Sequence, residues 1–577
     1  MKTLCKPFVK NLKAFLMKKI FVLNMLMTLF LFSCGQVDRD SKTLAETDFE
    51  KDEKTSSVQK PEKWNGWSYH EVETDANGIL PWYDPEHLGR SYDYVLRQVW
   101  NYWNNLPMML TGYKYHVQFR IANAAHSEKG AQEGGLGGDQ IGMAMSSWRL
   151  FYAYTGDPEL IADMKYMADT YLDLGLSPAS HSWPNITYPC NINAGIEPGE
   201  ANTEGTLPLI YNGDTRDGVG ITQPDKAGSF AYEMLMLYEM TGETNYLEAA
   251  IKMAVTLASK VQPGDIENAP LPFKVNAETG EVVAPYTSNW VSTIKLFEEL
   301  TRLGEGNYSD EVATFKDFLK NIAIPNHKYG PFFEDIIGYS ETSINAVTLA
   351  MYILEQGPAW GPGWQKDAKN ILSFCKEKFS IEAQPYRKTR LGVEYQAAEF
   401  NKLYKVKPIA EQTAYMVPGN SHTSRYASIV LMYGEKTGET SDEAMAIKQL
   451  SWATYMVKSN GQNCYPFDGV WLTDGYGDYV RHYLRAMAAH PELAPDNSNH
   501  LLRTTSVVSD ISYSDKSIKY STFDAESSEL FRLVSKPRSI TVGGKKLKAK
   551  AYSWEELDEG GVLRITSDQG TERVIKL

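Results

Sequence analysis

The chain has 577 residues, a formal net charge of −14 and 43% hydrophobic residues. This length is too great for one small core, and the hydrophobic content excludes a disordered chain. Because a strongly acidic protein binds nucleic acid poorly, no nucleic-acid partner is expected.

Residues 1–33 are predicted to be a lipoprotein signal peptide. They contain six lysines and no acidic residue, and their hydrophobic run, 20–32, is too short for a typical membrane span. The run ends in LFSC, which resembles a bacterial lipobox and implies cleavage before Cys34 and lipidation of its thiol. The alternative is an ordinary secretory signal with a chance cysteine. We expect an exported outer-membrane lipoprotein, facing the periplasm or the cell surface and attached to the membrane only by its lipid.

Residues 34–62 are polar and charged, with almost nothing to bury, and predict a flexible tether. Removal of the signal peptide would leave 52 basic against 72 acidic residues. Such an acidic chain can still bind an acidic ligand if its cations gather in one cleft.

Over 63–503 the dominant pattern is amphipathic helix. Similar segments recur at 151–172, 237–258 and 431–453, with a looser copy at 297–319. Each has an apolar helix, a turn that contains glycine, and a second helix. Because one helical hairpin cannot bury its own apolar face, repeated hairpins predict stacking. The uneven spacing predicts hairpins that close into a ring with variable loops on one side.

Residues 504–577 have a different pattern, with short alternating runs separated by glycine, aspartate and serine. These runs predict a small antiparallel β-sandwich that serves as a packing domain. The predicted strands fall within 516–524, 528–535, 539–548, 560–568 and 571–577.

Polar and aromatic side chains gather in the loops between the hairpins. The first of these loops is too polar for a core and too rich in rings for a simple linker. It offers His181, Trp183, Asn185 and Tyr188, although His181 alone is as well explained by a role in a turn.

The next two loops offer fewer candidates. Asn289 and Trp290 stand at the predicted start of a helix. Glu334 and Asp335 follow further along, where the alternative to function is a charge pair at a helix N-terminus.

The stretch PGNSHTSRYAS is the strongest candidate. If Asn420 or Ser421 caps a helix, then His422, Arg425 and Tyr426 fall at positions i, i+3 and i+4 and share one face. The alternative is a well-satisfied patch of helix surface.

The last loop contains Trp471 and Tyr476 and is followed by Asp478, Arg481 and His482. The spacing of the last three residues is equally compatible with an ion pair inside one helix.

The chemistry of these groups favours proton transfer. No cluster of ligands has metal-binding spacing, and no phosphate or dinucleotide loop is present, so neither a metal nor a cofactor is expected. A group of His, Tyr and Arg suits β-elimination from a uronic acid, because cations can neutralise the carboxylate next to the weakly acidic carbon. Glycoside hydrolysis would need two opposed carboxylates, which Glu334 or Asp335 could form with Asp474 or Asp478.

Helical hairpins followed by a β-sandwich, on an exported lipoprotein, resemble the α/α-toroid polysaccharide lyases. The loops FFEDI, NSHTSRYAS and DGYGDYVRH resemble, more narrowly, marine bacterial enzymes that attack ulvan, a sulfated rhamnose–uronate polysaccharide. The resemblance covers roughly 90–510. It implies a mainly α fold, an α/α toroid with a small sandwich, and either a chain-cleaving lyase or a dehydratase that removes water from a terminal uronate.

The resemblance also implies roles for single residues. The proton-exchanging His and Tyr of the toroidal lyases fall most naturally on His422 and Tyr188, with Arg425 as the carboxylate clamp. The usual Asn–His–Tyr order is not cleanly reproduced, which leaves the base open between Tyr188 and Tyr426.

We therefore predict a lyase that acts on an anionic, uronate-containing carbohydrate, with ulvan as the first substrate to test. A glycoside hydrolase and a non-catalytic glycan-binding lipoprotein are the alternatives. The predicted catalytic residues are His422, Tyr188, Arg425, Tyr426 and His181, and the predicted substrate-binding residues are Asn185, Trp183, Asn289, Trp290, Trp471, Tyr476 and Arg481.

Overall fold

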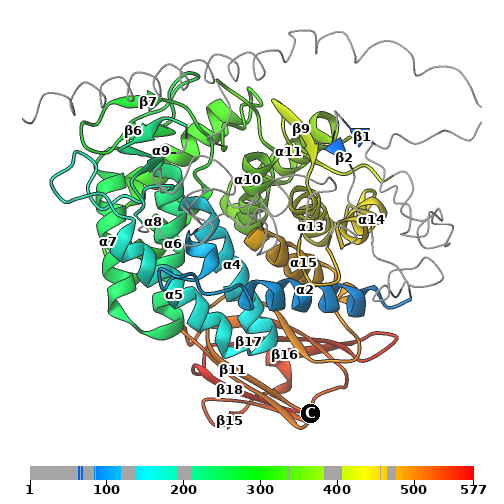
Figure 1. Ribbon diagram of the computed structural model, residues 1–577. Helices are drawn as coiled ribbons and strands as arrows, with labels where there is room; N and C mark the ends of the chain where they lie inside the picture. Colours follow the sequence, from blue (N-terminus) through cyan, green and yellow to red (C-terminus); the bar gives the residue numbers. More distant parts are fainter. Residues whose placement is uncertain are drawn as a thin grey trace, which may run out of the picture. The chain divides into compact units, whose positions relative to one another are not determined.

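The computed structural model of the chain describes residues 63–64, 67–68, 84, 86–118, 138–190, 210–214, 216–333, 338–381, 406–454, 457–463 and 476–577. Pro61–Leu577 form one compact unit, which contains the helices and the strands (Figure 1). The predicted signal peptide, the tether and Cys34 lie outside the described residues. Within the described parts, no helix is long and apolar enough to cross a membrane.

The helices form an α/α toroid of inner and outer helices, as the sequence predicts (Figure 1). Within the described part of the chain, each inner helix contacts the next and the last contacts the first, so the ring closes. In ring order the inner helices are α4 (Gly138–Thr155), α6 (Pro224–Thr241), α8 (Val291–Leu303), α10 (Ser343–Gln356), α13 (Asn420–Thr437) and α15 (Tyr479–Ala489). The outer helices are α5 (Pro158–Leu174), α7 (Thr244–Ala258), α9 (Ser309–Phe318), α11 (Trp364–Phe379), α14 (Glu443–Thr454) and α2 (Leu88–Asn104).

Glycine turns join inner helices to outer helices and confirm the repeat. The glycine after each of four inner helices has a positive φ, a conformation that glycine adopts without steric cost. These residues are Gly156 (73°), Gly242 (74°), Gly304 (82°) and Gly438 (78°). After α10, Gly357 also has a positive φ (53°), but its ψ of −129° lies outside the left-handed helical region, and the chain continues as a 3-10 turn over Gly357–Ala359. This different path explains why the sequence repeat does not include the hairpin of α10 and α11.

The connections give the ring two different ends. Short turns follow the C-termini of the inner helices, and we call this the turn end. Long segments lead into their N-termini, at the end that we call the loop end. These segments and the chain start hold α3 (Tyr115–Gln118) and the short strands β1 (Lys63–Trp64), β2 (Trp67–Ser68), β3 (Gly213–Asp214), β4 (Gly218–Val219), β5 (Ile221–Thr222), β6 (Lys274–Asn276), β7 (Val282–Ala284), β8 (Ala410–Gln412) and β9 (Tyr415–Pro418). The predicted site loops therefore converge at the loop end.

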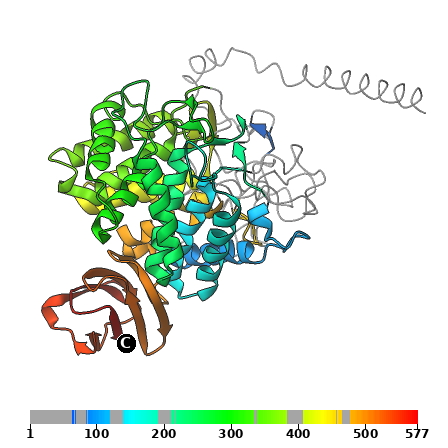
Figure 2. The same ribbon diagram turned by 90° about the vertical axis from the view of Figure 1, so that its left-hand side faces the viewer.

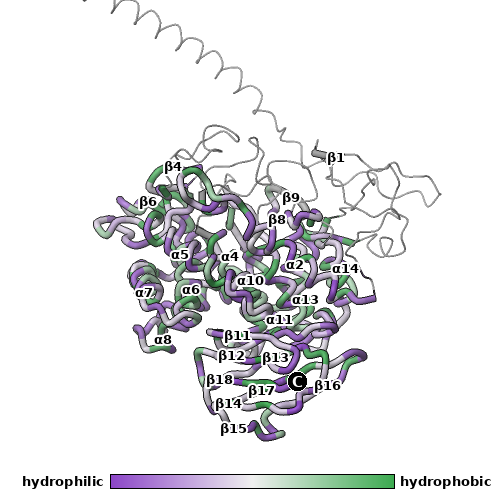
Figure 3. The backbone as a smooth tube through the Cα atoms, turned by 60° about the horizontal axis from the view of Figure 1, so that its bottom comes forward, coloured by the Kyte–Doolittle hydropathy of each residue, from purple (hydrophilic) through white to green (hydrophobic). Residues whose placement is uncertain are grey.

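The core of the ring lies between the inner and outer helices. Hydrophobic and hydrophilic stretches alternate along the helices (Figure 3), as expected for helices with one buried face. Inner helices such as α6 and α13 are buried on nearly every side. The largest fully buried side chains of the ring include Trp103, Trp148, Trp290, Trp360 and Trp452.

The C-terminal domain has two antiparallel sheets, in the orders β10-β13-β17-β16 and β11-β12-β18-β14-β15. Strands β10 and β11 contact α4, so this domain packs on the turn end (Figure 2). Its first strand begins at His500, before the predicted boundary, and β10, β11 and β16 were not identified from the sequence. The strands are β10 (His500–Thr504), β11 (Val508–Ser514), β12 (Ser517–Thr522), β13 (Ser527–Leu533), β14 (Ser539–Val542), β15 (Lys545–Lys546), β16 (Tyr552–Glu556), β17 (Gly561–Ser567) and β18 (Glu572–Lys576).

Candidate active site

The first turns of α13 lie at the loop end and carry His422 and Arg425. The helix begins one residue earlier than expected, because Gly419, and neither Asn420 nor Ser421, is the N-cap. The carbonyl of Gly419 accepts hydrogen bonds from the backbone N–H of Thr423 at 2.9 Å and from its hydroxyl at 2.6 Å. These bonds start the helix without a capping side chain.

Only two of the three candidate side chains on α13 lie together. Nη1 of Arg425 is 3.2 Å from Nδ1 of His422. Tyr426 lies on a different face, where its hydroxyl donates to the carbonyl of Leu372 in α11 at 3.4 Å. Arg425 and Tyr426 are adjacent and point about 100° apart, Arg425 toward Asp478 and Tyr426 toward α11. The prediction that Tyr426 joins His422 and Arg425 in one group is therefore wrong.

Asp478 joins α13 to α15. Its carboxylate forms ion pairs with Arg425 on α13 and with Arg481 on α15, and Nε2 of His482 lies 3.0 Å from Oδ2. The ion pair that the sequence left open therefore exists inside α15 and extends to the neighbouring helix. Both carboxylate oxygens face cations, which makes Asp478 unsuitable as the acid of a glycoside hydrolase.

Burial keeps the imidazole of His422 neutral. Its side chain is 6% exposed, and burial, followed by the charges of Arg425 and His482, lowers the pKa of His422 far below its ordinary value. A guanidinium only donates hydrogen bonds, so Nδ1 of His422 accepts from Arg425 and the ring proton lies on Nε2. His422 therefore presents a donor to a ligand, and this tautomer does not suit a base acting through Nε2.

Two residues that were not among the predicted site residues contact His422, although one of them, Phe333, stands in the FFEDI loop. The hydroxyl of Ser343, at the start of α10, lies 3.4 Å from Nδ1 of His422. The ring of Phe333 meets the imidazole edge-on, with centroids 6.0 Å apart. Both residues belong to the segment that leads into and begins α10, whereas His422 lies on α13, so no spacing in the sequence could have associated them with His422.

A second polar group lies at the start of α6 and includes the predicted residue Asn289. The amide of Asn289 donates to Oδ2 of Asp225 at 2.8 Å, and Nζ of Lys226 donates to the same oxygen at 2.9 Å. Lys226 also donates to the carbonyl of Phe332 at 2.9 Å. Because Phe332 precedes Phe333, one loop contacts both polar groups.

Tyr188 and His181 form a separate pair in the segment between α5 and α6. The hydroxyl of Tyr188 lies 3.4 Å from Nδ1 of His181. Burial, with a smaller contribution from Glu278, raises the pKa of Tyr188. Among the described residues, no hydrogen bond or ring contact joins this pair to His422.

Two predicted substrate-binding residues, Trp290 and Trp183, are buried instead, and a third, Asn185, lies in a turn that does not test its predicted role. Trp290 is 0% exposed and donates its indole N–H to the carbonyl of Thr287 at 2.8 Å, so its ring is unable to stack on a sugar. Trp183 is 4% exposed, which contradicts the same expectation. Asn185 has a φ of 57° in a tight turn, a conformation that Asn tolerates better than most residues.

The remaining predicted residues divide into two sets. Arg481 belongs to the cluster around Asp478, and its terminal nitrogen donates to the hydroxyl of Ser146 at 2.5 Å. Burial lowers the pKa of Arg481 to about 10, so its charge persists at neutral pH. Outside the described residues lie Trp471, Asp474, Glu334, Asp335 and the side chain of Tyr476.

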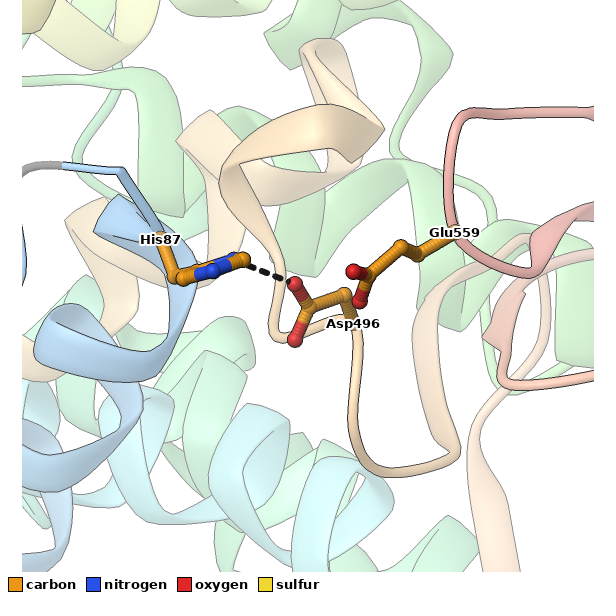
Figure 4. A group of neighbouring side chains, drawn as sticks. All are labelled: His87, Asp496 and Glu559. Atoms are coloured by element: carbon orange, nitrogen blue, oxygen red, sulfur yellow. Dashed lines mark hydrogen bonds and ion pairs between the residues drawn. The ribbon is translucent and has the colours of Figure 1, made fainter.

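Among the residues that the structure describes, one group has ligand atoms close enough together to hold a metal cation. It consists of His87, Asp496 and Glu559 (Figure 4). Nδ1 of His87 is 2.8 Å from Asp496. Nε of Arg90 lies 2.5 Å from Asp496, and its Nη2 lies 3.4 Å from Glu559. The guanidinium of Arg90 already supplies the positive charge that a metal cation would bring. The group is therefore an ion-pair network between α2 and the C-terminal region.

Comparisons with known proteins give only distant similarities. No protein-family model and no curated protein matches the chain. Similar solved structures include a cellobiose 2-epimerase from Spirochaeta thermophila, with 9% identity, a TM-score of 0.48, and coverage of 70% of this chain and 98% of that chain. An unsaturated glucuronyl hydrolase specific for heparin has 11% identity and a TM-score of 0.40, with coverage of 71% of this chain and 98% of that chain. A polysaccharide lyase has 11% identity and a TM-score of 0.40, with coverage of 70% of this chain and 98% of that chain. At these values neither substrate nor reaction is taken from those proteins.

Proposed function

We propose that this chain is an enzyme that acts on an anionic, uronate-containing carbohydrate by β-elimination, with ulvan as the first substrate to test. The observation that carries the proposal is the buried cluster at the loop end. There, one carboxylate, Asp478, holds Arg425, Arg481 and His482 beside a neutral His422. The two guanidinium groups outnumber the single acid in positive charge, which suits a ligand that brings its own negative charge.

The chemistry assigned to each residue follows from its protonation. β-Elimination removes a proton from the carbon next to the carboxylate, which requires stabilisation of the enediolate charge. In the proposed mechanism Nε2–H of His422 and the guanidinium of Arg425 stabilise that charge. Tyr188 and its hydrogen-bonded partner His181 are the proposed proton-exchanging pair. They take the proton from that carbon and return a proton to the leaving oxygen, whose bond to the neighbouring carbon breaks as the double bond forms.

The test uses purified protein with ulvan, alginate, a heparinoid and pectate, followed by ultraviolet absorbance of the unsaturated uronate and by product mass. A lyase shortens the chain and produces the absorbance, whereas a dehydratase only removes water. New reducing ends without absorbance would indicate a hydrolase, and binding without turnover would indicate a capture protein. No absorbance on any uronate polymer or oligomer, with folded protein, contradicts the proposal.

Two variants from the same helix provide a matched control. His422→Ala is expected to lower kcat by about 10²- to 10³-fold, the usual loss when one hydrogen-bond donor to a developing oxyanion is removed. Tyr426→Phe is expected to leave kcat nearly unchanged, because that hydroxyl contacts α11 and not the cluster. An equal decrease of kcat in both variants would show that the substitutions act through the stability of the helix and not through the chemistry.

We further propose that the enzyme is an exported outer-membrane lipoprotein, based on the lipobox-like sequence that ends at Cys34. Labelling of expressing cells with radioactive palmitate should tag the wild-type chain and not Cys34→Ser. Label in both chains, or in neither, would contradict the anchor.

A further inference from the structure

A cavity of about 1210 Å³ lies inside the ring, between the inner helices and the C-terminal sheets. All six inner helices named above contribute to its wall, together with residues of β10, β13 and β17. This volume is comparable with the largest small-molecule sites in proteins. Arg425 and Arg481 of the Asp478 cluster belong to the wall, and so do residues of β10, β13 and β17 at the turn end.

Most charged side chains in the wall already have partners. Arg149 donates to the carboxylate of Glu233 at 3.2 and 3.4 Å. The other pairs in the wall include Lys295 with Glu355 at 2.5 Å, Arg302 with Asp524 at 2.8 Å, and Arg503 with Glu435 at 2.6 Å. These charges compensate one another without a ligand.

Arg485 is different. It lies one helical turn after Arg481 on α15 and lines the cavity. Among the residues that the structure describes, it has no hydrogen bond and no ion pair. Burial, followed by the charge of Arg481, lowers the pKa of Arg485 to about 9, so the guanidinium is still charged at neutral pH.

The acidic side chains of the wall compensate Arg485 only in part. The charges of Glu355 and Glu233 act on Arg485 and oppose the lowering of its pKa, but Glu355 already pairs with Lys295 and Glu233 with Arg149. Burial, with the nearby Glu299, raises the pKa of Glu239 to about 9, which leaves this carboxyl neutral at neutral pH. A partly buried cation without a partner is energetically unfavourable, and an anion from solution would offset that penalty.

We propose that Arg485, with Arg149 and Arg481 in the same wall, forms an oxyanion-binding site in the cavity. Its ligand carries a sulfate, phosphate or carboxylate group, since the planar guanidinium donates two parallel hydrogen bonds to such groups. The site shares Arg481 with the Asp478 cluster, but it is centred on Arg485 and does not depend on the proposed β-elimination. The ligand is either a free inorganic oxyanion or the acidic group of a sugar.

Isothermal titration of the full chain tests the site, with sodium sulfate and sodium glucuronate as titrants and chloride holding the ionic strength constant. Wild type is expected to bind at least one of them, and Arg485→Gln should weaken that binding by about tenfold or more. Sulfate binding alone indicates a free oxyanion, and glucuronate binding indicates a sugar-derived group. Binding of neither, or unchanged affinity in Arg485→Gln, overturns the proposal.

The matched control is Arg503→Gln, which removes a guanidinium from the same wall that already pairs with Glu435. Its affinity should equal that of wild type, and a loss equal to that of Arg485→Gln would overturn the assignment. If Arg485→Gln does not fold, wild-type crystals soaked in selenate provide the test. An anomalous peak within hydrogen-bond distance of Arg485 supports the site, and its absence overturns it.

Discussion

The position of one proton on His422 decides what the loop end can do. Arg425 donates to Nδ1 at 3.2 Å, so the neutral ring keeps its proton on Nε2. Burial and the neighbouring cations lower the pKa of His422, which prevents a second proton from binding at neutral pH. In this state His422 is a hydrogen-bond donor of fixed orientation.

We predict that His422→Gln retains more activity than His422→Ala, because the glutamine amide can donate from nearly the position of Nε2–H. The measurement is kcat on whichever uronate substrate gives absorbance. Nitrogen-15 NMR of the histidines should also show the Nε2–H tautomer of His422 between about pH 6 and 8, with no titration in that range. Equal kcat values for both variants, or a titrating His422, would contradict this assignment.

At the scale of elements, Asp478 connects two inner helices. It precedes α15 and pairs with Arg425 of α13 as well as with Arg481 of its own helix. Its side chain is 1% exposed, so its charge is not screened by solvent. The position of α13 relative to α15 at the loop end therefore depends on one buried carboxylate.

We predict that Asp478→Asn lowers the free energy of unfolding by about 3–5 kcal/mol, because buried cations lose their counter-charge. Urea denaturation followed by circular dichroism measures the change. Asp442→Asn is the control, since its pair with Lys376 is exposed on both sides and exposed pairs contribute little. Similar small changes in both variants would show that the Asp478 pairs are not important for stability.

Close approach of α6 and α8 depends on a glycine. A Cβ atom at Gly228 would lie 2.0 Å from the hydroxyl oxygen of Thr293 and 3.0 Å from its Cβ. Thr293 is fully buried, so it has little room to move. The sequence shows only a glycine inside a helix, where glycine is otherwise unfavourable.

We predict that Gly228→Ala destabilises the fold by about 1–3 kcal/mol, as overpacking does. Gly142→Ala on α4 is the matched control, because the added Cβ would meet its nearest atoms at 3.5 Å, an ordinary contact. That variant should be neutral or stabilised by up to about 1 kcal/mol. Unfolding midpoints measured side by side test the difference, and a reversed order would contradict the packing argument.

At the scale of the whole molecule, buried neutral histidines make stability depend on pH. Nδ1 of His500 donates to the carbonyl of Tyr154 at 2.8 Å, and Ser498 donates to its Nε2 at 2.7 Å. The ring also stacks on Tyr154, with centroids 3.8 Å apart, and so joins α4 to the first strand of the sandwich. Burial lowers the pKa of His500, and likewise that of His116, to about 4.

In the unfolded chain these histidines have a pKa of about 6.5. Between that value and about 4, the unfolded chain binds protons that the folded chain does not, so stability falls as pH falls. We predict that His500 and His116 each add about 3 kcal/mol to the free energy of unfolding above pH 6.5, relative to its value below pH 4. This stability is lost progressively as the pH falls between those values. His422 and His482 act in the same direction.

Urea denaturation at pH 7 and pH 5 measures this dependence. His500→Asn keeps a donor for the carbonyl of Tyr154 but does not titrate, so it should reduce the loss between the two pH values. An identical loss in wild type and His500→Asn would contradict the role of His500.

Much of the architecture follows from local pattern. The glycine turns at Gly156, Gly242 and Gly438 and the alternation of strands such as β12 and β18 depend on neighbouring residues alone. For that reason the hairpins, their closure into a ring and the following sandwich could be predicted. The α10–α11 hairpin was missed because its turn uses a different backbone path.

Side-chain partners could not be predicted in the same way. The sequence by itself determined that His422 and Arg425 lie one turn apart on a helix, because helical spacing is a local property. Only the tertiary structure decided that Tyr426 faces α11, that Trp290 is buried and that Arg485 forms no ion pair with the residues that the structure describes. Those outcomes depend on which helices pack side by side, and contacts between distant segments arise from the packing of the whole ring.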